Sequence, residues 1–507
     1  MNRCRLLVTA SFSLIAAGVC IAGAPQEPAV GPQPIAPDAP DAAPVDPALL
    51  KAQIGELLQA YHEQRHFDGA ALIADDGKVV YQGAFGLANA DWKVPNGVDT
   101  RFRVGAITKQ FTAMLVLLLV QEGKLELGAP IGRYLPRLTA EIGDKVTIHH
   151  LLSHSSGIPP LGTGPGWQAD LRHHLSVDEL VARIGSRALE FEPGTEFRYS
   201  NAGYCLLGAI VEAVAGKTFG EVLRGRILEP LQMHDSGYDD QDAVLENRAT
   251  GYELLLGGRR LAPWTEMSNH FSSDGMYSTV LDLWKWEQAL RSGRLLNAAL
   301  AQRMFTPSAA GYGYGWHVDD HGIWHGSFNI APVDSAIRGF QGLVGRIPAR
   351  GRCVILLSNS GYASVADAAM QIADILEGRG PQTPAPRPAW ALAQTILDDG
   401  IESALARLVE LPRSLRETPR LPPGEIEGTI DLLGFRLLAQ RRVAEATSLF
   451  EFNARAFLKS AMRWDSLGEA HLQAGNRDLA LQSFRTAVEL EPWSARAKAR
   501  LAKAEAQ

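Results

Sequence analysis

Cysteine is scarce in this chain of 507 residues, which contains only Cys4, Cys20, Cys205 and Cys353. The first two lie near the amino terminus, and the other two are far apart in the sequence. So few cysteines exclude a dense disulfide framework. We expect Cys205 and Cys353 to be free and buried, and a disulfide between them, formed in an oxidising compartment, is the alternative. No group of them has the spacing of metal ligands, so the sequence predicts neither a metal site nor another cofactor.

An excess of basic residues is also missing, because the formal net charge is −7. This balance argues against a nucleic-acid partner, since binding to phosphates needs a basic face. Beyond the residues near the amino terminus, no segment is long and apolar enough to predict a membrane span. A hydrophobic content of 46% with 21% charged residues is typical of a soluble globular protein.

The amino terminus has the pattern of an export signal. Arg3 and Arg5 precede an uncharged stretch of apolar and small residues, 6–23. We therefore predict a signal peptide over residues 1–24, cut after Ala22 or Ala24, and a periplasmic or secreted protein. Lipid anchoring at Cys20 is disfavoured, because the preceding residues 17–19, Ala-Gly-Val, form a poor lipobox.

Composition divides the remaining chain. Residues 25–47 are rich in Pro, Ala and Asp and predict a disordered linker. A mixed region, 48–378, is followed by a second linker, 379–390, and by a helical region, 391–507. The mixed region contains a hairpin signal at Asp76-Gly77, an apolar helix ending near Gly123 and two strands joined by a turn at 349–351. These elements predict an α+β fold, in which an antiparallel sheet is flanked by helices.

The helical region repeats with a period of 34 residues. Leu433-Gly434 recurs as Leu467-Gly468, Ala446 as Ala480 and Phe450 as Phe484. This period is that of the tetratricopeptide repeat. We predict two such repeats, at about 430–461 and 464–497, that bind a protein partner; an unrelated pair of helical hairpins is the alternative interpretation.

Three motifs in the mixed region carry the functional hypothesis: FRVGAITKQFTA, then FEPGTEFRYSNAGYCLLGAIVEAVAG, then the stretch from GYGYGWHVDDHGIWHGS to IRGFQG. HHLLSHSSGIP and DGMYSTVLDLWKW lie between them. In this order they resemble the serine β-lactamase and penicillin-binding-protein family, of the class C β-lactamase and D-alanyl-D-alanine peptidase type. The resemblance covers about residues 50–378 and implies a β-lactamase/transpeptidase-like fold.

In that family the first motif is S-x-x-K, in which serine attacks a carbonyl and a desolvated lysine accepts its proton. Here the lysine is Lys109, but the serine position holds Ala106. A methyl group cannot attack, so the usual acyl-enzyme chemistry is excluded for the sequence as written. Thr108 lies about 200° around the helix from Ala106 and does not replace the serine. The nearby loop serines, Ser153, Ser155 and Ser156, are interpreted as structural.

The second motif is Tyr199-Ser200-Asn201, the family's Y-x-N. The resemblance implies that the tyrosine hydroxyl exchanges protons and that the asparagine holds the ligand. A cap at the start of a helix is the alternative reading of this segment.

The third motif, K-T-G or H-x-G in the family, has two possible alignments. We prefer His325-Gly326-Ser327, in which the last residue departs from glycine. The alternative, Val333-Asp334-Ser335, would leave no cation. An exposed loop histidine is the third interpretation of His325.

The sequence therefore leaves three hypotheses open. In the first, an impaired hydrolase homologue binds a peptidoglycan-type peptide, a β-lactam or an ester-like molecule, using the N–H of Ala106 as half of an oxyanion hole. In the second, the protein is an active β-lactamase, esterase or D-alanyl peptidase and Ala106 is an engineered change. In the third, it is a scaffold acting through its repeats.

Overall fold

The computed structural model describes residues 46–161, 172–255, 258–308, 310–320, 322–327, 337–384, 388–410, 425–492 and 494–506. The predicted signal peptide and nearly all of the first linker lie outside them. The chain divides into two compact units. The larger contains Pro44–Leu254 and Arg259–Pro384, and the smaller contains the chain from Ala385 onward. No helix within the described ranges is long and apolar enough to cross a membrane.

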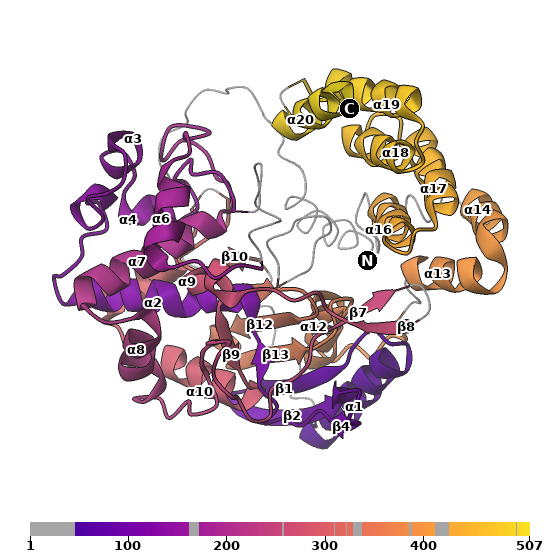
Figure 1. The fold of residues 1–507 in the computed structure, drawn as a ribbon. Helices are drawn as coiled ribbons and strands as arrows, with labels where there is room; N and C mark the ends of the chain where they lie inside the picture. The colour runs from indigo at the N-terminus through magenta and orange to yellow at the C-terminus, as the bar shows by residue number, and fades with distance from the viewer. Residues whose placement is uncertain are drawn as a thin grey trace, which may run out of the picture. The chain divides into compact units, whose positions relative to one another are not determined.

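The larger unit is built on a six-stranded antiparallel sheet with the order β10-β11-β12-β13-β1-β2 (Figure 1). Its strands are β1 (Gly69–Asp75), β2 (Lys78–Phe85), β10 (His317–Asp319), β11 (Gly322–Ser327), β12 (Gln341–Ile347) and β13 (Arg352–Ser358). The first and last parts of this unit thus meet in one sheet, because β1 pairs with β13. This is the antiparallel α+β fold that the sequence predicts.

Two turns within the sheet follow from local sequence. Asp75 pairs with Lys78, so Asp76-Gly77 forms a two-residue hairpin turn in which both residues have positive φ, 49° and 70°. An Asp-Gly pair favours this geometry, and the hairpin prediction is confirmed. The second turn joins β12 to β13 and ends at Gly351, which has φ of 59°.

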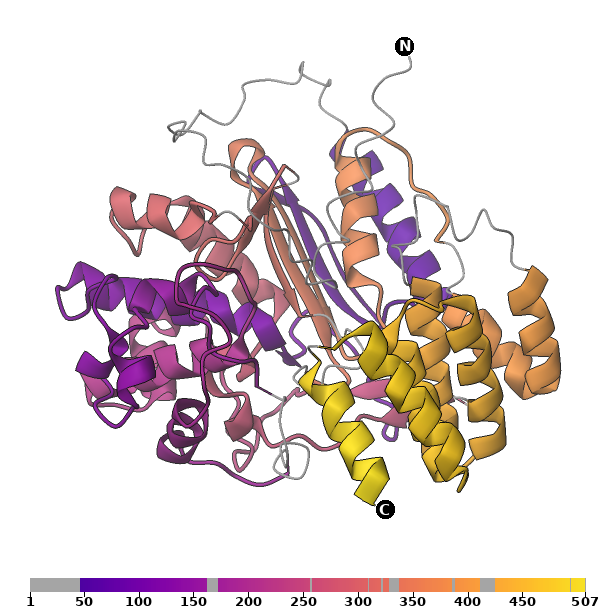
Figure 2. The same cartoon turned by 90° about the horizontal axis from the view of Figure 1, so that it is seen from above.

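Helices cover both faces of the sheet (Figure 2). On one face α1 (Pro47–Glu63) and α12 (Val365–Leu376) pack against β1, β12 and β13 through a separate apolar cluster. On the other face α10 (Val280–Arg291) packs against β1 and β13. The larger core lies on that side and joins the sheet to the helical part of the unit.

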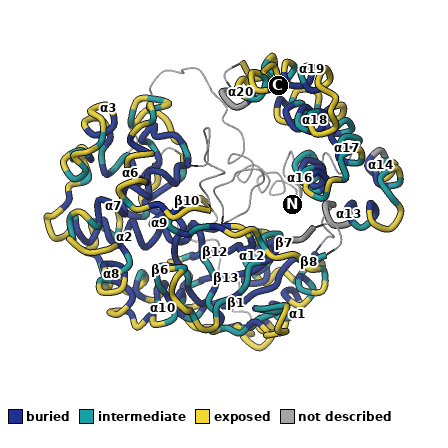
Figure 3. The backbone as a smooth tube through the Cα atoms, viewed as in Figure 1, coloured by how far each residue is buried: buried dark blue, intermediate teal, exposed yellow. Residues whose placement is uncertain are grey.

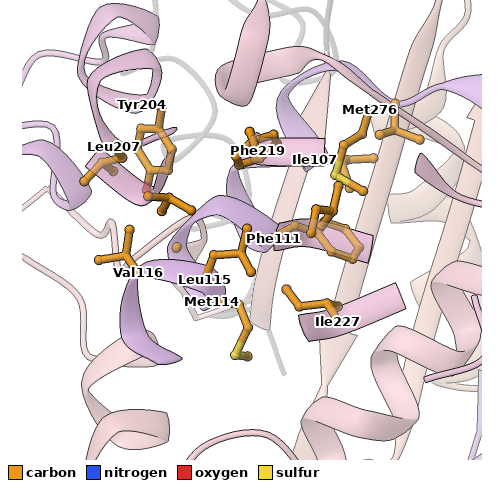
Figure 4. Packing of buried hydrophobic residues seen from close by; sticks show 14 of the residues in the cluster. Ile107, Phe111, Met114, Leu115, Val116, Tyr204, Leu207, Phe219, Ile227 and Met276 are labelled. Atoms are coloured by element: carbon orange, nitrogen blue, oxygen red, sulfur yellow. The ribbon is translucent and has the colours of Figure 1, made fainter. Parts of the chain in front are cut away.

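The helix α2 (Thr108–Gln121) lies at the centre of the larger core. Its residues Phe111, Met114, Leu115 and Val116 point into the surrounding apolar cluster (Figure 4). Phe111 stacks on the Trp286 ring with 4.4 Å between the centroids. Burial on all sides explains the long apolar run and fixes the position of the amino-terminal turn of α2, where the candidate site begins.

The remaining elements of this unit are short strands and helices around that core. The strands form three small sheets: β3 (Leu87–Asn89) with β4 (Val94–Pro95); β5 (Phe102–Arg103), β9 (Met276–Ser278) and β6 (Gly237–Tyr238); and β7 (Tyr252–Leu255) with β8 (Gly258–Leu261). The helices are α3 (Ala140–Gly143), α4 (Ile148–Leu152), α6 (Val177–Gly185), α7 (Asn201–Ala215), α8 (Phe219–Leu223), α9 (Phe271–Asp274) and α11 (Ala298–Phe305). Single helical turns are η2 (Gly105–Ile107), η3 (Ile131–Arg133), η4 (Arg224–Leu228), η5 (Met267–Asn269) and η6 (Pro348–Arg350).

From residue 388 onward, the described part of the smaller unit contains helices and turns but no strand. The helices are α13 (Pro388–Asp398), α14 (Gly400–Glu410), α16 (Glu425–Ala439), α17 (Val443–Ala456), α18 (Ala461–Gln473), α19 (Arg477–Leu490) and α20 (Ala495–Ala506). Among the described side chains, buried and exposed residues alternate along these helices (Figure 3).

One contact in this unit recurs after 34 residues. A Cβ added to Gly434 would lie 2.5 Å from the Phe450 ring, and one added to Gly468 would lie 2.6 Å from the Phe484 ring. Glycine is required at both positions because the aromatic ring occupies the space of a side chain. The same packing thus accompanies the repeated residues, while their assignment to tetratricopeptide repeats stays a prediction.

Candidate functional site

The site begins at η2, directly before α2. Gly105 has φ of 53°, and a Cβ at this position would lie 2.1 Å from the Ser327 hydroxyl oxygen. Only glycine fits both the conformation and the approach of β11. The Val104 N–H donates to the Met276 carbonyl at 3.0 Å, which ties the start of η2 to β9. These contacts place Ala106 beside the end of β11.

Ala106 is 9% exposed, and its backbone N–H has no acceptor within the described part of the chain. The carbonyl oxygen of Ala106, in contrast, has a partner, because the Thr108 N–H bonds to the carbonyls of Gly105 and Ala106. A backbone N–H that has no acceptor at the start of a helix is available to a ligand carbonyl. The family resemblance implies that the second N–H of an oxyanion hole comes from the strand after the third motif, and residues 328–336 there lie outside the described part.

Lys109, one turn after Ala106, is completely buried. Its ammonium donates to the Ser273 carbonyl at 3.1 Å and contacts the Asp274 carboxylate at 3.4 Å. It lies 5.0 Å from the centre of the Tyr199 ring. Burial lowers the pKa of Lys109, and the Asp274 charge acts in the opposite direction. The charge of Lys109 is thus paired with Asp274, while Tyr199 faces the ammonium with its ring.

The Tyr199 hydroxyl bonds to His325 Nε2 at 3.3 Å. His325 lies on β11, is 1% exposed, and its Nδ1 lies 2.7 Å from the Gly315 carbonyl oxygen. Because a carbonyl only accepts, Nδ1 carries the proton, and Nε2 of the neutral ring accepts from the tyrosine. Burial holds the pKa of His325 well below its usual value of 6.5, so the ring is neutral at pH 7. Burial likewise raises the pKa of Tyr199 well above 10.

Gly315 fixes the distance between His325 and α2. It has φ of 78°, and a Cβ there would lie 2.7 Å from the Lys109 carbonyl oxygen. A side chain at Gly315 would push this segment away from the first turn of α2. The carbonyl that orients His325 is therefore held against the backbone of Lys109 itself.

The residues predicted from the three motifs come together. The contacts form a closed circuit: from Gly105–Ala106 to Ser327, along β11 to His325, across to Tyr199, and over its ring to Lys109.

The other predicted residues are close in sequence to Tyr199 and His325. Asn201 is the first residue of α7 and is 8% exposed, and Gly326 lies between His325 and Ser327 on β11. His325 is therefore a buried strand residue and not an exposed loop histidine. The alternative third motif, Val333-Asp334-Ser335, lies outside the described residues.

Other hydroxyls near the first motif have local roles. Thr108 is fully buried, and its side-chain oxygen accepts from the Met276 N–H at 3.2 Å. The Ser153 hydroxyl bonds to the His149 carbonyl and to Ser155, and the Ser156 hydroxyl accepts from the Ile158 N–H. These bonds fit the interpretation of Thr108 and the loop serines as structural.

Sequence reasoning assigned no role to two residues at the site, Asp274 and His154. Asp274 follows the buried Ser273 at the end of α9, and only the tertiary fold reveals its contact with Lys109. His154 is 1% exposed and has positive φ, and its ring lies 4.3 Å from the Tyr199 ring. It accepts a bond from the Ser200 N–H at 3.1 Å and so fixes the backbone beside Tyr199. The position of His154 in the motif HHLLSHSSGIP is the sequence feature that could have indicated a role at the site.

The comparisons with known proteins agree with this fold. The Beta-lactamase family model matches residues 54–377. The chain therefore belongs to the β-lactamase family, which also includes penicillin-binding-protein-like serine hydrolases.

Similar proteins include penicillin-binding protein PbpX of Bacillus subtilis, 29% identical over 282 residues, which cover 54% of this chain and 69% of that protein. Esterase EstB of Burkholderia gladioli is 36% identical over 216 residues, 39% of this chain and 54% of the esterase. The chain thus spans about half to two thirds of these relatives. The octameric penicillin-binding protein homologue from Pyrococcus abyssi superposes with a TM-score of 0.57 at 28% identity, covering 69% of this chain and 81% of that one.

Proposed function

We propose that this protein is a catalytically impaired member of its family that binds an acyl ligand without forming a covalent bond. Ala106 occupies the nucleophile position in this proposal, and the ligand is a peptidoglycan-type peptide, a β-lactam or an ester-like molecule. The names of the relatives, a penicillin-binding protein and an esterase, support these ligand classes. The single observation that carries the proposal is the circuit of Lys109, Tyr199, His325 and Ser327, whose two ends meet the chain on either side of Ala106.

The arrangement supports binding in three ways. The N–H of Ala106 is available to a carbonyl oxygen. The Tyr199 hydroxyl donates to His325, so its oxygen can still accept a hydrogen bond from a ligand. The Ser327 hydroxyl lies beside the Gly105–Ala106 backbone, where it can contact the same ligand. None of these groups replaces the nucleophile in the proposal.

The test is incubation of the purified chain with a fluorescent penicillin, followed by denaturing electrophoresis. We expect reversible binding in solution and no labelled band. Ala106→Ser is the matched variant, and its labelling would show that the remaining site can support attack. A labelled band from the unaltered chain would contradict the proposal.

An active hydrolase is the second candidate, favoured by the intact contacts of Lys109, Tyr199 and His325. It requires that Ala106 stand where the natural protein has serine. Ester and β-lactam turnover of Ala106→Ser tests it. Since loss of such a nucleophile costs about 10⁶-fold in turnover, restoration by at least about 10³-fold is expected if the rest of the machinery is competent.

We further propose export to the periplasm or the medium, and a protein partner for the carboxy-terminal helices. The signal pattern at residues 1–24 supports the first proposal, and fractionation of cells that express the tagged chain tests it. The recurring Gly434 and Gly468 contacts support the second. Pull-down with the full chain and with a chain ending at residue 390 tests whether those helices bind a partner.

A further inference from the structure

A fully buried ammonium needs a counter-charge, because removing it from water disfavours the charged form. Lys109 is fully buried, and Asp274, with which it forms an ion pair of 3.4 Å, is 3% exposed. The Ser273 hydroxyl oxygen lies 2.6 Å from the other carboxylate oxygen of Asp274 and 2.7 Å from the His270 carbonyl oxygen, and these two acceptors share its proton. The carboxylate is therefore held in place beside the ammonium.

The other titratable groups around Lys109 are neutral at pH 7. Burial raises the pKa of Tyr199 and Tyr204 far above 7 and that of Cys205 to about 12. Burial lowers the pKa of His154 and His325 well below 6.5, and that of His270 to about 4. Among the described residues, Asp274 is thus the acidic side chain that balances the charge of Lys109.

We propose that Asp274 is a positioning residue that holds Lys109 as a protonated ammonium, so that this chain lacks a general base as well as a nucleophile. A base must offer a lone pair, and an ammonium in contact with a carboxylate has none. The inference about charge stands on the ion pair alone. Its consequence for turnover rests on the proposed function, because it assumes that Ala106 marks the nucleophile position.

The direct test is a pH titration of the Lys109 side chain by NMR in full-length protein labelled with ¹³C and ¹⁵N at lysine. The signal is assigned by its loss in Lys109→Arg. In Asp274→Asn we expect the midpoint of the Lys109 titration to fall by about 1 to 3 pH units, the usual effect of an opposite charge at this range. An unchanged midpoint would overturn the proposal.

Asp239→Asn is the matched control. Asp239 is also a buried aspartate, but it pairs with Arg103 and Arg248 instead of Lys109. We expect this variant to leave the Lys109 midpoint in place. An equal shift in Asp239→Asn would show a general effect of removing a buried carboxylate and would also overturn the proposal.

The consequence for turnover is tested in the Ala106→Ser background. Adding Asp274→Asn should raise kcat/KM for an activated ester at pH 7 at least about tenfold and move the rising limb of its pH profile to lower pH. A profile that does not move would contradict the role of Asp274. Labelling of the unaltered chain by penicillin would contradict the proposed function and leave the NMR result standing, so the two failures can be told apart.

Discussion

Both units of this protein bury charged side chains, but they use them differently. In the smaller unit Arg463 of α18 pairs with Glu427 and Asp431 of α16, and Arg500 of α20 pairs with Asp465 of α18. Asp465 follows Asp431 by 34 residues, so the pairing recurs along the helices. In the larger unit Lys109 has one acidic partner and lies among neutral tyrosine and histidine side chains.

The comparison teaches that burial of charge does not by itself mark a functional site. The pairs of the smaller unit join every second helix, α16 to α18 and α18 to α20, and their repetition indicates a packing role. The Lys109 pair lies one helical turn from the backbone N–H of Ala106, which bonds to no acceptor within the described residues. The circuit that links Lys109, Tyr199, His325 and Ser327 connects elements from distant parts of the sequence. That convergence, rather than burial, distinguishes the candidate site.

The largest expected effect distinguishes the function of the Lys109–Asp274 pair from that of the Arg463 pairs. Lys109→Met and Arg463→Met each leave a buried acid without its partner, which costs about 3 to 5 kcal/mol of stability. Only Lys109→Met should also weaken binding of the probe β-lactam, because Lys109 supports the Tyr199 ring. Calorimetry at a temperature where both variants remain folded measures this binding. Equal loss of binding in Arg463→Met would contradict the distinction drawn here.

A second, smaller effect tests the repetition in the smaller unit. Gly434→Ala and Gly468→Ala place a methyl group against the rings of Phe450 and Phe484, and overpacking of this kind costs about 1 to 3 kcal/mol. Chemical denaturation should give similar losses for the two variants. Gly428→Ala is the control, because no atom lies within 4 Å of its added Cβ, and it should cause no loss. Very different losses at positions 434 and 468 would show that the two contacts are not equivalent.

The smallest expected effect is a difference in acid sensitivity. The pKa of His270 and of His317 is lowered by burial to about 4. The unfolded chain therefore binds more protons as the pH falls below 6.5, and the larger unit loses stability progressively from there toward pH 4. At pH 5.5 the loss is about 1 kcal/mol for each histidine.

Hydrogen exchange with mass spectrometry measures this loss separately in each unit. Residues 391–507 contain one histidine, His471, so their protection should change less between pH 7 and 5.5. Replacing His270 and His317 by Gln should reduce the pH dependence of the larger unit. Greater acid sensitivity in the smaller unit would contradict the prediction.

Local sequence predicted much of the fold and part of the site. The Asp76-Gly77 turn, the buried helix that carries Lys109 and the strands β12 and β13 follow from short-range patterns and are confirmed. Cys205 and Cys353 are free and buried, as expected. Tyr199 and His325 were singled out through the family resemblance.

The partners of these residues could not be predicted. Asp274 is 165 positions from Lys109, and the Gly315 carbonyl meets His325 only because Gly315 packs on α2. Nothing in the local sequence of α9 indicates where its carboxylate points. The protonation of Lys109 and the tautomer of His325 depend on such contacts, and so does the chemistry that the site can perform.

The most direct test of the central claim follows the Ala106 amide by NMR in protein labelled with ¹⁵N-alanine, with the signal assigned by its loss in Ala106→Gly. Titration with benzylpenicillin should shift this amide in a saturable way, and dialysis should return it to its starting position. A shift that persists after dialysis would reveal a covalent adduct. No shift at saturating ligand would place Ala106 outside the binding site, and either result would contradict the account.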